Sequence, residues 1–148
     1  GNGSMEKYNS KSILAKTIAQ SNGIKDILVS LRDEDFDKDT NSVLKRIDIN
    51  FAKTEKGGAW SDLGASVGRM AARLKVIKHG DYYDVKLLGF DRSNYEYKED
   101  ASDIKDKWIR WANNFFYDLQ QQGLITPFSF EVTSNFYFNK SNGKVYTK

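Results

Sequence analysis

The sequence has no cysteine and only one proline and one histidine among its 148 residues. Without thiols the chain can form no disulfide bond, no thiolate zinc site and no cysteine nucleophile. The one histidine, His79, cannot build a zinc cage by itself, and any catalytic triad would have to include it. If the domain needs a metal, we therefore expect a hard divalent cation such as Mg²⁺ or Ca²⁺, held by carboxylate oxygens, although no ligand residues can be assigned.

Long apolar runs are also absent. No stretch approaches the roughly 20 apolar residues that a membrane helix needs, and no classical signal peptide opens the chain. Gly1–Ser4 stand before Met5 and are typical of residues left by cloning. We therefore expect residues 5–148 to form a single soluble domain without a transmembrane segment, and a monomer.

An excess of either charge is missing as well. Lysine and arginine total 23 against 20 acidic residues, a formal net charge of +3, and the two signs are interleaved along the chain. A dedicated nucleic-acid binder usually concentrates basic residues on one face or tail, so no nucleic-acid partner is expected. An apolar content of 39% with 14% aromatic residues argues against a disordered chain.

Two helical regions are predicted. Residues 12–32 carry apolar side chains at helical spacing, with Ser10 as the expected N-cap. Asn22–Gly23 predicts either an interruption of this helix or its division into two. Residues 101–122 repeat large apolar side chains every three or four positions, which predicts one long amphipathic helix. Its apolar face, which we expect to pack on the sheet, contains Trp108, Trp111, Phe115 and Leu119.

Alternating apolar and polar residues predict strands between these helices. Residues 43–52 alternate strictly, and residues 67–78 and 83–87 flank a Gly-containing turn, which is typical of a hairpin. Near the end of the chain, residues 128–132 and 136–138 predict two strands separated by a turn at Ser134–Asn135. The expected fold is α+β, a half-barrel-like antiparallel sheet packed with the N-terminal helices and the long amphipathic helix.

Two acidic or polar segments contain residue types that can carry chemistry. The run Asp33–Asp39 resembles a calcium loop, but Thr40 and Arg46 stand where such a loop needs glycine and glutamate, so a solvated loop is expected. The segment Gly89–Asp100 joins a strand to the long helix, where a scaffold can present polar groups. It offers carboxylates and a hydroxyl for acid–base work and Arg92 for pairing with phosphate. An ordinary charged connection explains the same pattern.

From Trp60-Ser61-Asp62-Leu63-Gly64 to about Phe138, the order of elements resembles the activity domain of the colicin M family of bacterial toxins. The shared features are the hairpin, the Asp-rich loop with Tyr95-Glu96-Tyr97, the amphipathic helix and the step from Gly123 to Pro127-Phe128. Members of this family cleave lipid II, the lipid-linked peptidoglycan precursor, at the lipid–pyrophosphate bond in the periplasm.

The resemblance implies particular site residues. Tyr95 matches the family tyrosine, Glu96 stands for the aspartate that follows it, and Asp91 serves as the first aspartate if the loop slips by two residues. Arg92 and His79 are the expected substrate-binding residues. The family's His-Arg pair would fall near Ser102–Asp103, where neither residue type is present.

The resemblance therefore predicts a secreted antibacterial toxin or effector domain, delivered to the periplasm of a target cell without a classical signal peptide. It implies a divergent hydrolase acting on a lipid-linked phosphoester, with an immunity protein as a partner. The alternative is a non-catalytic module that keeps the scaffold and binds a protein. Which applies depends on whether Asp91, Tyr95 and Glu96 converge in a cleft.

Overall fold

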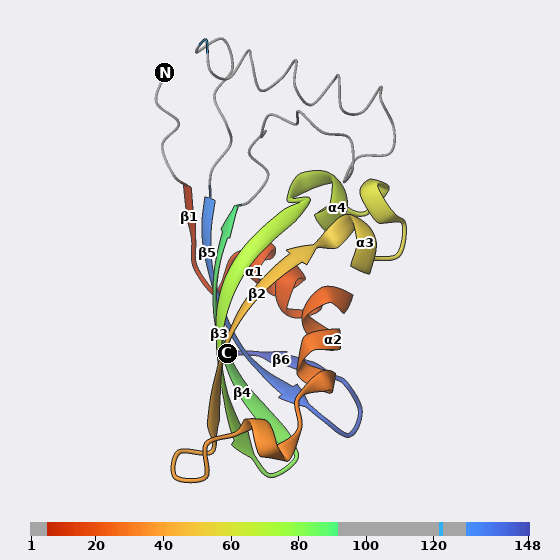
Figure 1. Cartoon of the computed structure of the whole chain (residues 1–148). Helices are drawn as coiled ribbons and strands as arrows, with labels where there is room; N and C mark the ends of the chain where they lie inside the picture. The colour runs from red at the N-terminus through yellow and green to blue at the C-terminus, as the bar shows by residue number, and fades with distance from the viewer. Residues whose placement is uncertain (1–5, 92–121, 123–129) are drawn as a thin grey trace, which may run out of the picture.

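A computed structural model describes residues 6–91, residue 122 and residues 130–148 of the chain. Within these ranges six strands form one sheet whose order is β1-β5-β4-β3-β2, with β6 also paired to β5 (Figure 1). The strands are β1 (Glu6–Tyr8), β2 (Ser42–Asn50), β3 (Arg69–His79), β4 (Tyr82–Asp91), β5 (Phe130–Asn139) and β6 (Val145–Thr147). The helices are α1 (Ile13–Ala19), α2 (Asn22–Ser30), α3 (Phe51–Thr54) and α4 (Asp62–Ser66), with short 3-10 turns η1 (Asp33–Asp35) and η2 (Gly58–Trp60).

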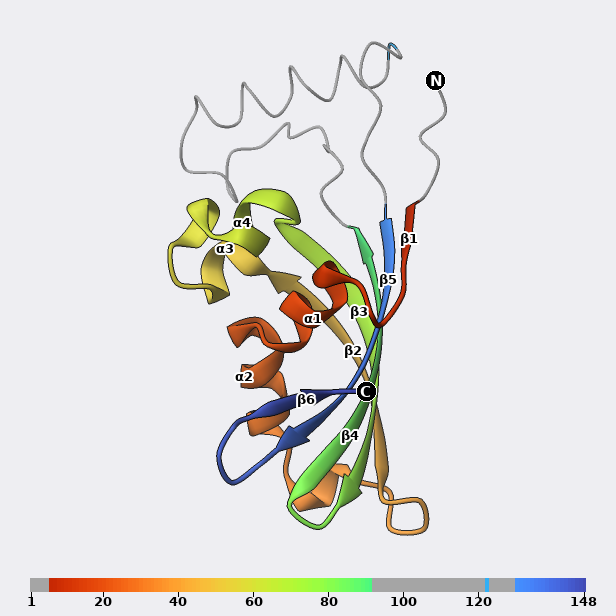
Figure 2. The same cartoon turned by 180° about the vertical axis from the view of Figure 1, so that it is seen from behind.

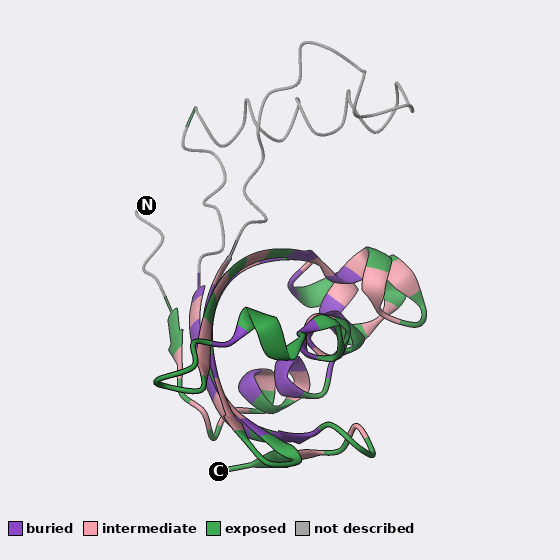
Figure 3. Cartoon of the chain, turned by 60° about the horizontal axis from the view of Figure 1, so that its bottom comes forward, coloured by how far each residue is buried: buried purple, intermediate pink, exposed green. Residues whose placement is uncertain are grey.

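The sheet is open and strongly curved, and α1 and α2 lie inside the curve (Figures 2 and 3). Neighbouring strands are antiparallel except β1 and β5, which run parallel. This confirms the predicted α+β class and the half-barrel-like, mainly antiparallel sheet. The long helix predicted over residues 101–122, with Trp108, Trp111, Phe115 and Leu119, lies outside the described residues except for Gln122, which is in an exposed turn.

The core fills the space between the concave face of the sheet and the helices. Alternate residues of β3, β4 and β5 point inward, because successive side chains of a strand point to opposite faces. Their buried members include Met70, Leu74, Val76, Val85, Leu87, Phe130, Phe136 and Phe138, and the helices add Ala15, Ile18, Ile24 and Leu28. The opposite, convex face of the sheet carries the exposed and half-buried half of the alternation, which contains most of the charged residues of β2 and β3 and also Leu44 and Phe90.

The first helical region is split in two, as the sequence predicts, but the break lies at Gln20–Ser21, Asn22–Gly23 begin α2, and the N-cap of α1 is different. The Ser21 hydroxyl accepts a hydrogen bond from the Ile24 amide at 3.2 Å and begins α2. The Ser12 hydroxyl, not that of Ser10, caps α1 by accepting from the Ala15 amide at 3.1 Å. The Ser10 hydroxyl instead accepts a hydrogen bond from the Asn135 amide at 2.8 Å. Ser10 thus gives a hydrogen-bond partner to the Asn135 amide of β5, which lies between the segment paired with β1 and the segment paired with β6.

The turn predicted at Ser134–Asn135 is wrong. These residues lie in the middle of β5, where Ser134 pairs with Leu87 and Asn135 with Lys86 of β4. Serine and asparagine favour turns because their side chains bond nearby backbone, but cross-strand packing overrides this preference here. The Ser134 hydroxyl is buried and donates to the Ala15 carbonyl at 2.8 Å, which ties β5 to α1.

Other element boundaries also move. The strand predicted over residues 43–52 ends at Asn50, whose side chain accepts from the Ala52 amide and begins α3. Phe51 therefore belongs to α3, where it is fully buried. Residues 145–147, for which the sequence predicts no strand, form β6, which pairs with β5 through Phe136–Phe138. Short strands such as β1 and β6 carry too few residues for alternation to reveal them.

Candidate functional site

The structure places two of the sequence-predicted site residues at opposite ends of one hairpin. His79 ends β3 beside Tyr82, whereas Asp91 ends β4 beside Met70. Tyr82 and Asp91 are the two ends of the 10-residue strand β4, and the nine steps between them correspond to about 30 Å at a rise of roughly 3.3 Å per residue. His79 is exposed, and the hairpin does not bring it to Asp91. Arg92, Tyr95 and Glu96 lie outside the described residues.

The acidic run forms a loop closed by its own carboxylates. One Asp37 carboxylate oxygen accepts hydrogen bonds from the amides of Asp39 at 2.8 Å and Thr40 at 3.1 Å. These two hydrogen bonds, the one from the Thr40 amide most and the one from the Asp39 amide next, lower the pKa of the Asp37 carboxyl below its usual range. Asp35 accepts from the Arg32 amide at 2.8 Å. These bonds stabilise the local turn, and among the residues described no three histidine or acidic side chains converge as metal ligands.

Trp60–Gly64 and Asp91, both part of the family resemblance, lie at the same end of the sheet. Trp60–Gly64 lies between the end of β2 and the start of β3, and Asp91 ends the neighbouring β4. Because these strands are antiparallel neighbours, the end of β2, the start of β3 and the end of β4 lie at the same end of the sheet. A surface hollow lined by Trp60–Leu63 lies at this end of the molecule.

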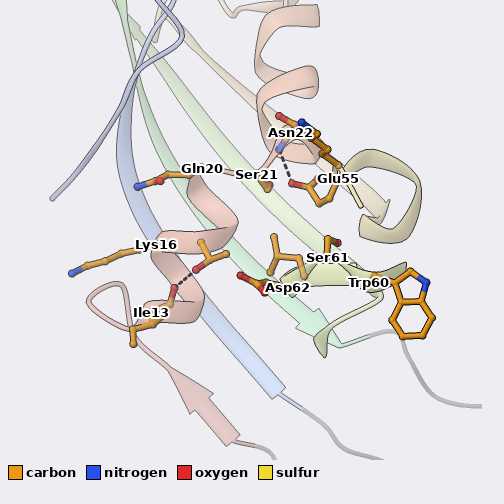
Figure 4. Close-up of a pocket in the computed structure, with 12 residues that line it drawn as sticks. Ile13, Lys16, Gln20, Ser21, Asn22, Glu55, Trp60, Ser61 and Asp62 are labelled. Carbon is orange, nitrogen blue, oxygen red and sulfur yellow. Dashed lines mark hydrogen bonds between the residues drawn. The ribbon is translucent and has the colours of Figure 1, made fainter. Parts of the chain in front are cut away.

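This hollow is an open groove of about 570 Å³ between α1 and the start of α2 on one side and α3, η2 and α4 on the other. We call it the Trp60 groove (Figure 4). Its lining contains Ile13, Lys16, Thr17, Gln20, Ser21, Asn22, Glu55, Lys56, Trp60, Ser61, Asp62 and Leu63. The lining is therefore mixed, with apolar side chains at its margins and charged and amide groups between them.

Two large apolar side chains of the groove are almost fully exposed. Trp60 is 93% exposed and Ile13 is 85% exposed. Tryptophan is normally among the more buried residues on average, because its ring removes a large apolar area from water. Nothing in the described chain covers this ring, and Figure 4 shows it projecting from the turn that precedes α4.

The turn that carries Trp60 is fixed by its backbone. Gly57 and Gly58 both have left-handed backbones, with φ of 93° and 59°. The Ser61 hydroxyl donates to the Gly58 carbonyl at 2.6 Å and accepts from the Gly64 amide at 3.0 Å. A Cβ on Gly64 would lie only 2.1 Å from that same carbonyl oxygen, so glycine is required at this position. Trp60 is thus presented by a closely packed turn.

The Glu55 carboxylate, which lines the groove, caps the N-terminus of α2. The Glu55 carboxylate accepts hydrogen bonds from the amides of Asn22 at 2.9 Å and Gly23 at 3.0 Å, and from the Thr54 hydroxyl at 2.5 Å. A negative charge at a helix N-terminus is favoured by the free amides there and by the helix dipole. Glu55 therefore connects α3 to α2 and fixes the two walls of the groove relative to each other.

Sequence reasoning did not identify this groove. From the sequence, Trp60 is notable only as part of the family resemblance, and Ile13 only as one apolar residue of the first predicted helix. The local signals were present: paired glycines before a tryptophan predict an exposed turn, and Ser61 three residues before Gly64 predicts a helix cap. What the sequence lacks is any sign that α1 lies opposite that turn, because this depends on tertiary packing.

Comparison of the chain with protein-family models, with curated proteins and with solved structures found no match. Over the part of the chain that the structure covers, no helix has the length and apolar character required to cross a bilayer. Function must therefore be argued from the geometry of the groove and of the sheet.

Proposed function

We propose that this chain is an interaction domain that binds a segment of another protein in the Trp60 groove. The observation that carries the proposal is the nearly complete exposure of Trp60 and Ile13 on the margins of one groove. Burying two such side chains would remove a large apolar area from water, which is the main favourable term in protein association. Tryptophan is also the residue type most enriched among interface hot spots.

The fixed turn around Trp60 supports this proposal. Binding is weakened when side chains and loops must be ordered on association, and a ring already held in place avoids much of that cost. The paired glycines, the two hydrogen bonds of Ser61 and the Glu55 cap all restrict the groove before any partner arrives. A turn whose only role was to connect β2 to β3 would not need an exposed tryptophan.

The charges of the groove indicate the chemistry of the partner. Lys16 and Lys56 are exposed in its lining and form no ion pair with any described residue. The Glu55 carboxylate already accepts three hydrogen bonds, which leaves Asp62 as the remaining acidic group. We expect a partner segment with one large apolar side chain, to contact Trp60 and Ile13, next to one or two carboxylates that pair with the lysines.

A peptide-display selection against the whole chain tests the proposal, followed by affinity measurement with the synthetic peptides. Selected peptides should combine a large apolar residue with neighbouring Asp or Glu. Trp60→Ala should weaken their binding by about 30-fold or more, the loss typical of a hot-spot tryptophan. Val29→Ala is the matched control, since Val29 is 68% exposed on α2 but does not line the groove. The proposal fails if no peptide is enriched, or if Trp60→Ala and Val29→Ala bind equally well.

A second candidate function follows from the position of Asp91. Because Asp91 and Trp60–Gly64 lie at the same end of the sheet, the colicin M-like arrangement of loop and turn is compatible with the fold. On this proposal the chain is an antibacterial effector domain. Asp91, Tyr95 and Glu96 act on a lipid-linked phosphoester in the periplasm, with Arg92 binding the phosphate, and an immunity protein is its partner. A role for His79 would require a separate site.

Expression in a bacterial host separates this candidate from the first. An effector acting on the peptidoglycan precursor should be toxic when exported to the periplasm and harmless in the cytoplasm. Asp91→Asn and Glu96→Gln should abolish that toxicity without lowering the melting temperature, because the amides keep the shape but remove the charge. Toxicity in neither compartment, or toxicity that both variants retain, would exclude the hydrolase.

A further inference from the structure

The convex face of the sheet gathers basic residues that the sequence disperses. Arg46 of β2 lies directly opposite Arg73 of β3, and Lys75 of β3 lies directly opposite Lys86 of β4. All four are exposed, and none forms an ion pair with a described residue. We call these four residues the basic cluster. Neighbouring strands are about 4.8 Å apart and alternate residues about 6.8 Å apart along a strand, so the four Cα atoms span roughly 10 Å.

This arrangement is unfavourable for the isolated fold. Like charges directly opposite each other on a sheet repel, and here two such pairs are adjacent. Acidic residues on the same face include Asp84, which pairs with Lys148 at 2.5 Å, and Asp48, which lies two residues from Arg46 on β2 and opposite Ala71 of β3. A cluster of cations that has no ion pair among the described residues is compatible with a stable sheet, and added anions would lower its repulsion.

A surface hollow and three exposed tyrosine rings lie on the same face as the basic cluster. A hollow of about 340 Å³ lies over the small side chain of Ala71 and is lined also by Arg46, Asp48, Arg73 and the half-buried Phe90, so that it holds one carboxylate beside two guanidinium groups. Beyond the other side of the basic cluster, three tyrosines are 40–45% exposed. These are Tyr82, Tyr137 and Tyr146, of which Tyr82 and Tyr146 have ring centroids 6.3 Å apart.

We propose that the convex face binds single-stranded nucleic acid. The basic cluster would neutralise successive phosphates, and unpaired bases would stack on the guanidinium planes, on Phe90 and on the exposed tyrosines. Proteins that bind single strands without strict sequence preference combine these two features, a positively charged track and aromatic stacking surfaces. A purely acidic peptide such as polyglutamate would use the cations but has no aromatic groups for the hollow and rings. An anionic membrane surface would likewise leave the hollow empty.

This inference is independent of the Trp60 groove, which lies on the concave side of the sheet. The interleaved charges of the sequence predict no nucleic-acid surface, because the two signs alternate along the chain. The sheet changes this, since Arg46, Arg73, Lys75 and Lys86 come from three strands that the register brings side by side.

Fluorescence anisotropy of the full chain with labelled 12-nucleotide DNA and RNA single strands of mixed sequence tests the proposal. If four phosphates are neutralised, the logarithm of the binding constant should fall with the logarithm of salt concentration with a slope of about −2.8, from roughly −0.7 per contact. Arg73→Gln or Lys75→Gln should each reduce the slope by about 0.7. Tyr137→Ala should weaken binding by at least about fivefold without changing the slope, because it removes stacking rather than charge.

The double variant Arg73→Gln/Lys75→Gln should lose most binding. Its matched control is Lys38→Gln/Lys53→Gln, which removes the same charge from exposed positions outside the convex face and should bind within twofold of the wild type. Equal losses in both double variants would show an effect of net charge and overturn the assignment. No binding to the oligonucleotides, or equally tight binding to a polyglutamate peptide or to phosphatidylglycerol vesicles, would also overturn it.

Discussion

Arg46 and Arg73 occupy directly opposed positions on β2 and β3, and both guanidinium groups are exposed on the convex face. Opposed like charges destabilise an antiparallel pair, whereas opposite charges stabilise it by roughly 0.2–1 kcal/mol. We therefore expect Arg73→Glu to raise the free energy of unfolding by an amount of about that size at low salt. The gain should shrink in 0.5 M salt, because exposed charges are screened.

Urea denaturation at two salt concentrations measures this effect. Lys144→Glu is the control, since Lys144 is exposed in the β5–β6 turn and changes net charge equally. If Arg73→Glu lowers stability, or if the control is stabilised to the same extent, the repulsion argument is wrong. A stabilising substitution that also weakens oligonucleotide binding would show that the basic cluster is kept for function at a cost to stability.

Much of the fold could be predicted because burial on one face imposes a clear pattern. The β3–β4 hairpin alternates through Leu74, Val76, Val85 and Leu87, all buried on the concave face, and Gly80 has the positive φ that its turn requires. Such a pattern fixes both the type of element and its inward side. The same argument fails at Ser134, because a small polar residue inside a strand gives no apolar signal and is buried through a partner far away in sequence.

The two proposed binding surfaces could not be predicted, since both depend on register and packing. Nothing local in the sequence indicates that Arg46 pairs with Arg73, or that Ile13 lies across a groove from Trp60. The loop residues highlighted by the family resemblance, Tyr95 and Glu96, lie outside the described residues and stay predictions. Of the remaining candidates, His79 and Asp91 are separated by the length of the hairpin.

The Glu55 cap should contribute measurably to stability. Glu55→Ala removes an acceptor from the amides of Asn22 and Gly23, which lie at the start of α2. Loss of such a cap costs about 0.5–2 kcal/mol, and we expect the upper half of this range because both bonds are charge-assisted. Glu55→Gln should lose about half as much, since one oxygen remains as an acceptor. Chemical denaturation measures both, with Lys56→Ala as a surface control expected within about 0.5 kcal/mol of the wild type.

Gly64→Ala should disturb the turn that presents Trp60. Its Cβ would lie 2.1 Å from the Gly58 carbonyl oxygen, a backbone atom that cannot rotate away as a side chain would. Overpacking of this kind costs about 1–3 kcal/mol, and we expect the higher value here. Ala59→Ser, at an exposed position of the same turn, should change stability by less than about 0.5 kcal/mol. A fully stable Gly64→Ala protein that still binds the selected peptides would mean that the turn is adaptable and that preorganisation does not matter.

The Asp37 loop should lose stability in acid. Hydrogen bonds from the amides of Thr40 and Asp39 favour the ionised carboxylate, so the pKa of Asp37 is lower in the folded chain than in the unfolded one. Its contribution to stability is therefore fully present above the unfolded pKa and is lost as the pH falls through the folded pKa. Asp37→Asn should be less stable than the wild type at pH 7, and this difference should close in acid.

Unfolding free energies measured from pH 7 to pH 2 test this sign directly. Asp39→Asn is the control, because its carboxylate accepts no hydrogen bond from any described residue and its stability should follow that of the wild type at every pH. An Asp37→Asn deficit that stays constant across the range would mean that shape, not charge, explains the loss. A deficit that widens in acid would reverse the sign and show that the protonated carboxyl is the form the folded loop prefers.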